Sequence, residues 1–226
     1  MNKTNYQLLL DRILSNEEAA GRVPTLLLHS CCAPCSSYSI EYLSQHFFVT
    51  VFYFNPNISP EAEYRHRVAE QQRLISEMPT VNPVSFIEGE YDPRKFYEAS
   101  NGLEHEPEGG LRCTECFRLR LGRTAQIAAE RGFDYFTTTL TISPMKDAVR
   151  LNAIGEEMGR KYGIAFLPSD FKKRGGYLRS IELSRQYGLY RQNFCGCVFS
   201  RQEAERRAKA KAGSEAETEK GGETGK

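Results

Sequence analysis

Residues 25–37 read TLLLHSCCAPCSS, an apolar run followed at once by a loop that holds three cysteines. The run Thr25 to Leu28 is too short and too apolar for a surface helix, so it predicts a buried strand that ends at the cysteine loop. The other cysteines lie far downstream in two tight pairs. All seven cysteines of the chain therefore fall into three groups: Cys31, Cys32 and Cys35; Cys113 and Cys116; Cys195 and Cys197. Such grouping is typical of a site.

Short apolar segments alternate with amphipathic ones along the rest of the chain. The apolar segments predict strands at Thr25–Leu28, Phe47–Phe54, Val84–Ile87, Phe133–Thr139 and Ile164–Leu167. Between them the sequence predicts helices over Asn5–Ala20, Ser36–Gln45, Pro60–Met78 and Cys113–Arg131, a short helix opened by Asp92-Pro93, and one from Ser143-Pro144 to Gly163. This alternation predicts a Rossmann-like, three-layer α/β domain with a mostly parallel sheet.

Ligands of such sheets gather at the carboxyl ends of the strands. His29-Ser30-Cys31, Asn55–Asn57 and Thr139–Ser143 all follow predicted strands, so the cysteine loops are expected at that edge. The chain has 226 residues, which favours a single catalytic domain over residues 1–210. Residues 211–226 lack large apolar side chains and are expected to form a disordered tail.

Composition restricts the compartment and the class of partner. No apolar run reaches about 18 residues and no signal sequence stands at the start, so we expect a cytoplasmic protein that does not enter the membrane. The formal net charge is +1, so any contact with nucleic acid must depend on local patches. A chain of this size does not need disulfide bridges for stability, and its clustered cysteines indicate metal binding or redox chemistry.

Three kinds of cysteine site compete. Cys32-Ala-Pro-Cys35 has the spacing of a thioredoxin-type redox motif, but Cys31 directly before it and the four distant cysteines argue against a plain thiol-disulfide oxidoreductase. A zinc-stabilised RNA-binding module needs two Cys-x-x-Cys pairs close in sequence, whereas Cys35 and Cys113 are separated by two predicted strands. Iron–sulfur ligation fits better, because thiolates from distant loops of one sheet can converge on a cluster.

Cys195-Gly196-Cys197 differs from the other groups because one residue separates its cysteines. A disulfide between them would close a small, strained ring that is easily reduced and suited to electron transfer. Metal binding by both thiols is the alternative, and the sequence leaves it open. Among the histidines only His29 adjoins the site. Nucleotide hydrolysis and hydride transfer from NAD have no support, because no P-loop and no GxGxxG follows a strand.

With these residues in view, the chain closely resembles the epoxyqueuosine reductase family of the QueH type. The resemblance spans most of residues 26–200 and rests on the segments LLLHSCCAPCS (26–36), FYFNPNISPEAEYRHR (52–67), GLRCTECFRLRL (110–121), TTTLTISPMKD (137–147) and SDFKKRGGYLRSIELSRQYGLYRQNFCGCVFS (169–200). It implies an enzyme that reductively removes the epoxide oxygen of epoxyqueuosine in tRNA, giving queuosine at the wobble position. The resemblance also implies an external electron donor and no cobalamin.

The resemblance further assigns the cysteines. It implies one [4Fe–4S] cluster held by Cys31, Cys32, Cys113 and Cys116, with or without an additional mononuclear iron, and a redox-active pair formed by Cys195 and Cys197. Cys35 stands where the family is expected to carry an aspartate that helps to bind the extra iron. This chain would offer a softer ligand at that position.

Basic and aromatic residues surround the last two cysteine groups, as expected for a protein that holds the anticodon loop of a tRNA. They are Lys172, Lys173, Arg174, Tyr177, Arg179, Arg185, Tyr187, Tyr190 and Arg191 near the last pair, and Arg112, Arg118, Arg120 and Arg123 near the second group. A solvated helix face with core tyrosines is the alternative. Asp170, Tyr91 and Tyr177 are candidate proton donors, and the sequence does not choose among them.

Overall fold

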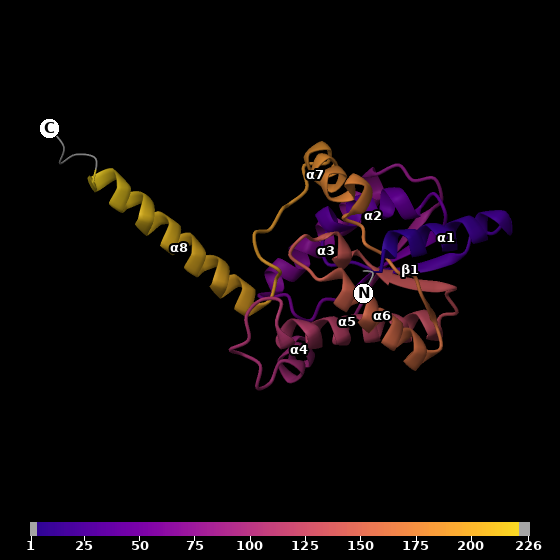
Figure 1. Ribbon diagram of the computed structural model, residues 1–226, viewed down its shortest axis with the longest axis horizontal. Coiled ribbons are helices and arrows are strands. Elements are labelled where there is room, and N and C mark those ends of the chain that lie inside the picture. The colour runs from indigo at the N-terminus through magenta and orange to yellow at the C-terminus, as the bar shows by residue number, and fades with distance from the viewer. Residues whose placement is uncertain (1–3, 222–226) are drawn as a thin grey trace.

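Five parallel strands form one sheet at the centre of the computed structural model, which describes residues 4–221 (Figure 1). The strand order is β3-β2-β1-β4-β5, and every pair within the described residues is parallel. The strands are β1 (Thr25–His29), β2 (Phe48–Tyr53), β3 (Val84–Glu88), β4 (Tyr135–Thr138) and β5 (Ala165–Phe166). The predicted α/β class with a parallel sheet is confirmed.

β1 is the central strand, and its sequence explains its place. Leu26, Leu27 and Leu28 are fully buried, as expected for a strand that helices cover on both faces. Leu26 and Leu28 belong to one core cluster and Leu27 to the other, because successive side chains of a strand point to opposite faces. The sheet is thus the middle of three layers.

Helices cover both faces of the sheet. Side chains of α1, α2 and α3 pack into the core cluster of Leu26, whereas side chains of α5 and α6 pack into that of Leu27. The helices are α1 (Tyr6–Ala19), α2 (Ala33–Leu43), α3 (Glu61–Glu77), α4 (Pro93–Ala99), α5 (Leu111–Glu130), α6 (Ala148–Tyr162), α7 (Gly176–Gln186) and α8 (Val198–Gly221), with two 3-10 turns at Thr139–Ile142 and Lys173–Gly175.

Several predicted helix starts differ from the structure, and the start of α6 differs most. The helix expected from Ser143-Pro144 begins at Ala148, because Asp147 accepts hydrogen bonds from the N–H groups of Val149 and Arg150 and so caps it. The helix predicted from Pro60 begins at Glu61, with Pro60 as its flanking residue. The predicted end at Gly163 is confirmed, because this glycine adopts a left-handed conformation there.

α8 projects away from the rest of the molecule (Figure 1). Its helical backbone continues to Gly221, whereas the sequence predicts a disordered tail from residue 211. The difference has a simple cause, because the alanines, glutamates and lysines that cannot form a core are also strong helix formers. Residues 222–226 lie outside the described part of the chain. Within residues 4–221, no helix is long and apolar enough to cross a membrane.

Candidate metal and thiol site

The loop after β1 carries the first cysteine group and is very short. β1 ends at His29 and α2 begins at Ala33, so Ser30, Cys31 and Cys32 alone make the connection. Asn55, in the loop after β2, donates from Nδ2 to the carbonyl of Ser30 at 2.8 Å, and the Ser30 hydroxyl donates to Gln71 Oε1 at 2.7 Å. These buried hydrogen bonds fix the backbone on which the thiols stand.

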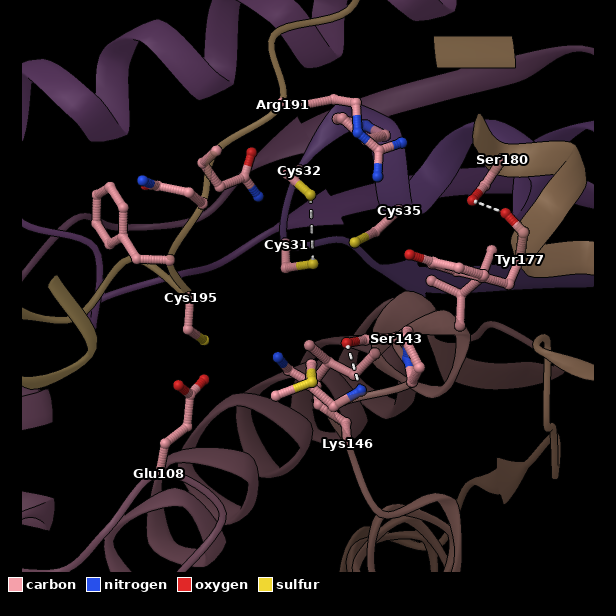
Figure 2. Close-up of a pocket in the computed structure, with 18 of the residues that line it drawn as sticks. Cys31, Cys32, Cys35, Glu108, Ser143, Lys146, Tyr177, Ser180, Arg191 and Cys195 are labelled. Carbon is pink, nitrogen blue, oxygen red and sulfur yellow. Dashed lines mark hydrogen bonds between the residues drawn. The ribbon is translucent and has the colours of Figure 1, made fainter. Parts of the chain in front are cut away.

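The three thiols of this group converge. The sulfur atoms of Cys31, Cys32 and Cys35 all lie within 4.8 Å of one another, and those of Cys31 and Cys32 are 3.7 Å apart (Figure 2). Cys32 flanks the N-terminus of α2 and Cys35 lies in its first turn. Within the described residues, these cysteines are the one group of three or more His, Cys, Asp or Glu with the spacing of a metal site.

The pKa values of these three thiols are shifted in opposite directions. Hydrogen bonds from Cys32 and then Cys35 hold the pKa of Cys31 well below its usual value. The same contacts with Cys31 raise the pKa values of Cys32 and Cys35. Without a metal, Cys31 is therefore the thiolate and its two neighbours are the donors.

The four remaining cysteines line a second, enclosed cavity. Cys113 and Cys116 lie in the first two turns of α5, and Cys195 and Cys197 lie in the segment between α7 and α8. The cavity has a volume of ≈ 20 Å³, which is room for about one water molecule. Burial raises the pKa values of Cys113, Cys116 and Cys197, so these thiols are protonated when no metal is bound.

Cys195 joins the two cysteine regions. It lines the enclosed cavity and also a larger one of ≈ 260 Å³, whose wall includes Cys31, Cys32 and Cys35. Figure 2 shows Cys195 facing this larger cavity from the side opposite to Cys35. All seven cysteines are free and border two adjoining cavities that share Cys195.

A tight turn holds the last cysteine pair. Gly196 has φ of 125°, and a Cβ atom there would lie 2.9 Å from Ile58 Cγ1, so only glycine fits without strain. Arg67, on α3, donates from Nη1 to the carbonyl of Cys195 at 3.1 Å. Its guanidinium is buried but paired with Glu63, with 2.7 Å between Nε and Oε1. The turn is thus anchored to α3 through the carbonyl of Cys195.

The predicted cations of a nucleic-acid surface separate into three sets. Arg112 and Arg120 are buried, so the expectation that they contact tRNA phosphates is corrected: both lie on the inward face of α5. Lys173, Arg185 and Arg191 are exposed, and Arg191 also lines the larger cavity. The remaining charges are partly occupied by ion pairs: Arg174 with Asp11, Arg179 with Glu41, Arg118 with Glu157 and Lys172 with Asp170.

The candidate proton donors also separate. Tyr177 lines the larger cavity and its hydroxyl points into it (Figure 2). Tyr91 instead donates to the carbonyl of Ile58, and Asp170 is paired with Lys172 outside this cavity.

Three charged residues of the wall of the larger cavity, Glu108, Lys146 and Arg207, were missed from the sequence. Lys146 and Glu108 both line the larger cavity, and Glu108 lines the enclosed one as well (Figure 2). Electrostatic attraction to the sulfur atoms of Cys195 and then Cys31 raises the pKa of Lys146, which therefore stays protonated. The position of Lys146 in the loop after β4, at the ligand-binding edge of the sheet, was the available signal.

The similarity of this chain to known proteins covers the region that contains the cysteine groups. The sequence pattern of a family described as "Epoxyqueuosine reductase QueH" matches residues 26–203, which contain all seven cysteines. An epoxyqueuosine reductase QueH of Staphylococcus epidermidis is 46% identical over 202 residues, which cover 88% of this chain and 85% of that protein. A Streptococcus pyogenes relative of the same name is 45% identical over 200 residues, covering 88% and 78%. One from Thermotoga maritima is 38% identical over 179 residues, covering 78% and 90%.

Proposed function

Because the chain belongs to the epoxyqueuosine reductase QueH family of oxidoreductases, we propose that it removes the epoxide oxygen of epoxyqueuosine in tRNA and gives queuosine at the wobble position. The convergence of seven free cysteines on two adjoining cavities is the observation that carries this proposal. The tRNA substrate makes the cytoplasm the proposed compartment.

The donor set suits an iron–sulfur cofactor. Three sulfur atoms within 4.8 Å of one another, without a bridging disulfide, form a thiolate-rich environment of the kind that binds iron. From the family resemblance we assign Cys31, Cys32, Cys113 and Cys116 to a [4Fe–4S] cluster, although this structure places the first two on the larger cavity and the last two on the enclosed one. Cys35, which converges with Cys31 and Cys32, is assigned to an additional mononuclear iron where one is present. Bound iron supplies single electrons and Lewis acidity without cobalamin.

Cys195 and Cys197 are proposed as the redox-active pair. Deoxygenation breaks both C–O bonds of the epoxide, forms a C=C bond and releases water, and it consumes two electrons and two protons. Closing two thiols to a disulfide releases two of each, so the dithiol balances the reaction. The disulfide would be strained across Gly196, which makes it easy for an external electron donor to reduce it again.

The larger cavity is the proposed site for the modified base. Its volume of ≈ 260 Å³ and its position between Cys35 and Cys195 suit a base that has been turned out of the anticodon loop. Tyr177 supplies a hydroxyl for the departing oxygen, and Arg191 at the rim supplies charge for a phosphate. Exposed Lys173, just before α7, and exposed Arg185, within α7, are further cations of this region.

Nucleoside mass analysis of tRNA tests the proposal directly. A strain that lacks this gene and any second epoxyqueuosine reductase should accumulate epoxyqueuosine, and a plasmid copy of the natural gene should restore queuosine. A copy with Cys195→Ser should not restore it. Normal queuosine in the deletion strain would overturn the proposed function.

A further inference from the structure

Arg120, in the third turn of α5, is a charged side chain in the interior of the protein. It is 1% exposed and lies directly beneath the cysteine loops, at the carboxyl ends of β1 and β2. Burying a guanidinium without an opposite charge is costly, and most buried arginines are therefore paired with a carboxylate. What compensates this one has to be found among its neighbours.

The hydrogen-bond partners of Arg120 are all uncharged. Its Nη2 donates to Asn55 Oδ1 at 2.6 Å, its Nε to His29 Nε2 at 3.3 Å, and its Nη1 approaches Cys116 Sγ at 3.9 Å. No carboxylate forms an ion pair with it among the residues whose side chains the structure describes. Of the two other buried arginines, Arg67 is paired with Glu63, whereas Arg112 donates to backbone carbonyls of the loop before α5. Arg120 differs from both because its partners are an amide, an imidazole and a thiol.

His29 and Asn55 orient the guanidinium without neutralising it. Because the Nε of an arginine only donates, His29 Nε2 must accept, and the proton of the imidazole is on Nδ1, which donates to Thr138 Oγ1 at 2.9 Å. Asn55 uses its Nδ2 on Ser30, which leaves Oδ1 for Arg120. Burial and the charge of Arg120 lower the pKa of His29 to about 3, so the imidazole stays neutral.

The remaining candidates for the opposite charge are the sulfur atoms. When they are thiolates, Cys116, Cys31 and Cys195 are the groups whose negative charge stabilises the guanidinium of Arg120. Cys31 belongs to the group around the larger cavity and Cys116 to the enclosed cavity, so the guanidinium acts on thiolates of both groups. Lys146 faces Cys195 and Cys31 from the loop after β4 and is a second cation of the same kind.

We propose that Arg120 is a positioning residue that acts as the fixed internal counter-charge of the thiolate ligands, strengthens their hold on a metal and raises the reduction potential of the group that they bind. A cation beside the ligands offsets the repulsion between converging thiolates. It also stabilises the reduced form of a bound group over the oxidised form, because reduction adds negative charge. The statement about metal affinity stands on the thiols alone, whereas that about the potential rests on the proposed iron–sulfur function.

Co²⁺ binding tests the metal affinity. The metal-stripped protein is titrated anaerobically with Co²⁺, and the thiolate-to-cobalt absorption is followed for the natural protein, Arg120→Met, Arg120→Lys and Arg123→Met. We expect at least a tenfold weaker affinity in Arg120→Met, partial recovery in Arg120→Lys and no change in Arg123→Met. Arg123 is a matched control, because it lies one turn further along α5 in a surface cavity that none of the cysteines lines.

Redox titration of the anaerobically loaded proteins tests the potential. Arg120→Met should lower the equilibrium constant for one-electron reduction at least tenfold, which corresponds to a reduction potential about 59 mV lower. Arg120→Lys should restore part of this potential. Lys146→Met is the second variant, on a loop rather than in a helix core, and it should shift the potential in the same direction.

Unchanged Co²⁺ affinity in Arg120→Met with a natural circular dichroism spectrum would overturn the proposal. If Arg120→Met weakens Co²⁺ binding but the natural protein takes up no iron, the role of Arg120 in metal affinity is supported and the proposed iron–sulfur function is refuted.

Discussion

The charged side chains at the two ends of the parallel sheet have different partners. At the amino end, Arg22 pairs with Glu17 at 3.3 Å and with Asp134 at 3.2 Å, and the backbone and hydroxyl of Thr25 donate to Asp134. These groups are largely in contact with solvent. At the carboxyl end, Arg120 is buried among an imidazole, an amide and thiols, with no carboxylate paired to it in the described part of the chain.

This contrast indicates which end is built for function. The charges at the amino end are satisfied within the protein and cost little, since solvent screens them. The charges at the carboxyl end are balanced only when the cysteines are thiolates, which is the form that binds metal. An arrangement that is costly for the empty protein and favourable for the loaded one is expected at a site and not in a structural core.

The largest effect is expected from the cysteines themselves. Cys195→Ser should reduce turnover more than about 100-fold and retain bound iron, because the proposed reductant is lost and the proposed ligands remain. Cys31→Ser should lose both, since this residue supplies a thiolate to the first group. The measurements are deoxygenation of epoxyqueuosine-containing tRNA and iron per chain after anaerobic purification. Loss of iron in Cys195→Ser would show that Cys195 is a ligand and would move the redox role elsewhere.

The turn between the last two cysteines provides the next effect. Gly196→Ala places a methyl group 2.9 Å from Ile58 Cγ1 in a conformation with positive φ, at a cost of about 1–3 kcal/mol. The turn should move to relieve this contact and carry Cys195 out of position, so turnover falls about tenfold or more.

Gly21→Ala is the matched control for this substitution. Gly21 also has positive φ, but nothing lies within 4 Å of the added atom and the residue is at the amino end of the sheet. It should lose about 1 kcal/mol of unfolding free energy and keep natural turnover. Equal turnover in the two variants would mean that the geometry of the Cys195 turn does not limit the reaction.

The sequence predicts the scaffold of the site better than its interior. The leucines of β1 and the left-handed glycine at 163 have local causes, which is why the strand and the helix end were found. The start of α6 was missed because proline after Ser143 resembles a helix start, while the capping oxygen of Asp147 is equally local but less conspicuous. Which residue caps a helix is decided by competition between neighbouring signals.

The orientation of α5 was harder to predict from the sequence than the position of the strands. Arg120 was grouped with surface cations because arginine is seldom buried. Its spacing of four residues from Cys116 places both on the same face of a helix, and this was the signal that could have indicated an inward position. That Cys195 borders two cavities depends on contacts between α3, α5 and the segment before α8, which no local pattern encodes.

The smallest effect is expected at the amino end of the sheet, from Asp134→Asn. Hydrogen bonds from Thr25 hold the pKa of Asp134 below its ordinary value, and Arg22 lowers it further. A carboxyl group whose pKa is lower in the folded state stabilises the protein above its unfolded pKa of about 3.9, and this contribution is lost as the pH falls through the folded value. The variant should therefore lose about 1 kcal/mol or less of unfolding free energy at pH 7 and pH 5, after allowance for solvent screening, and the deficit should shrink below about pH 4.

Urea unfolding at pH 7, 5 and 3 measures this deficit, with Glu98→Gln as an exposed control. A deficit that persists undiminished at pH 3 would show that Asp134 acts through shape and not through charge, and the contrast between the two ends of the sheet would then rest on the carboxyl end alone.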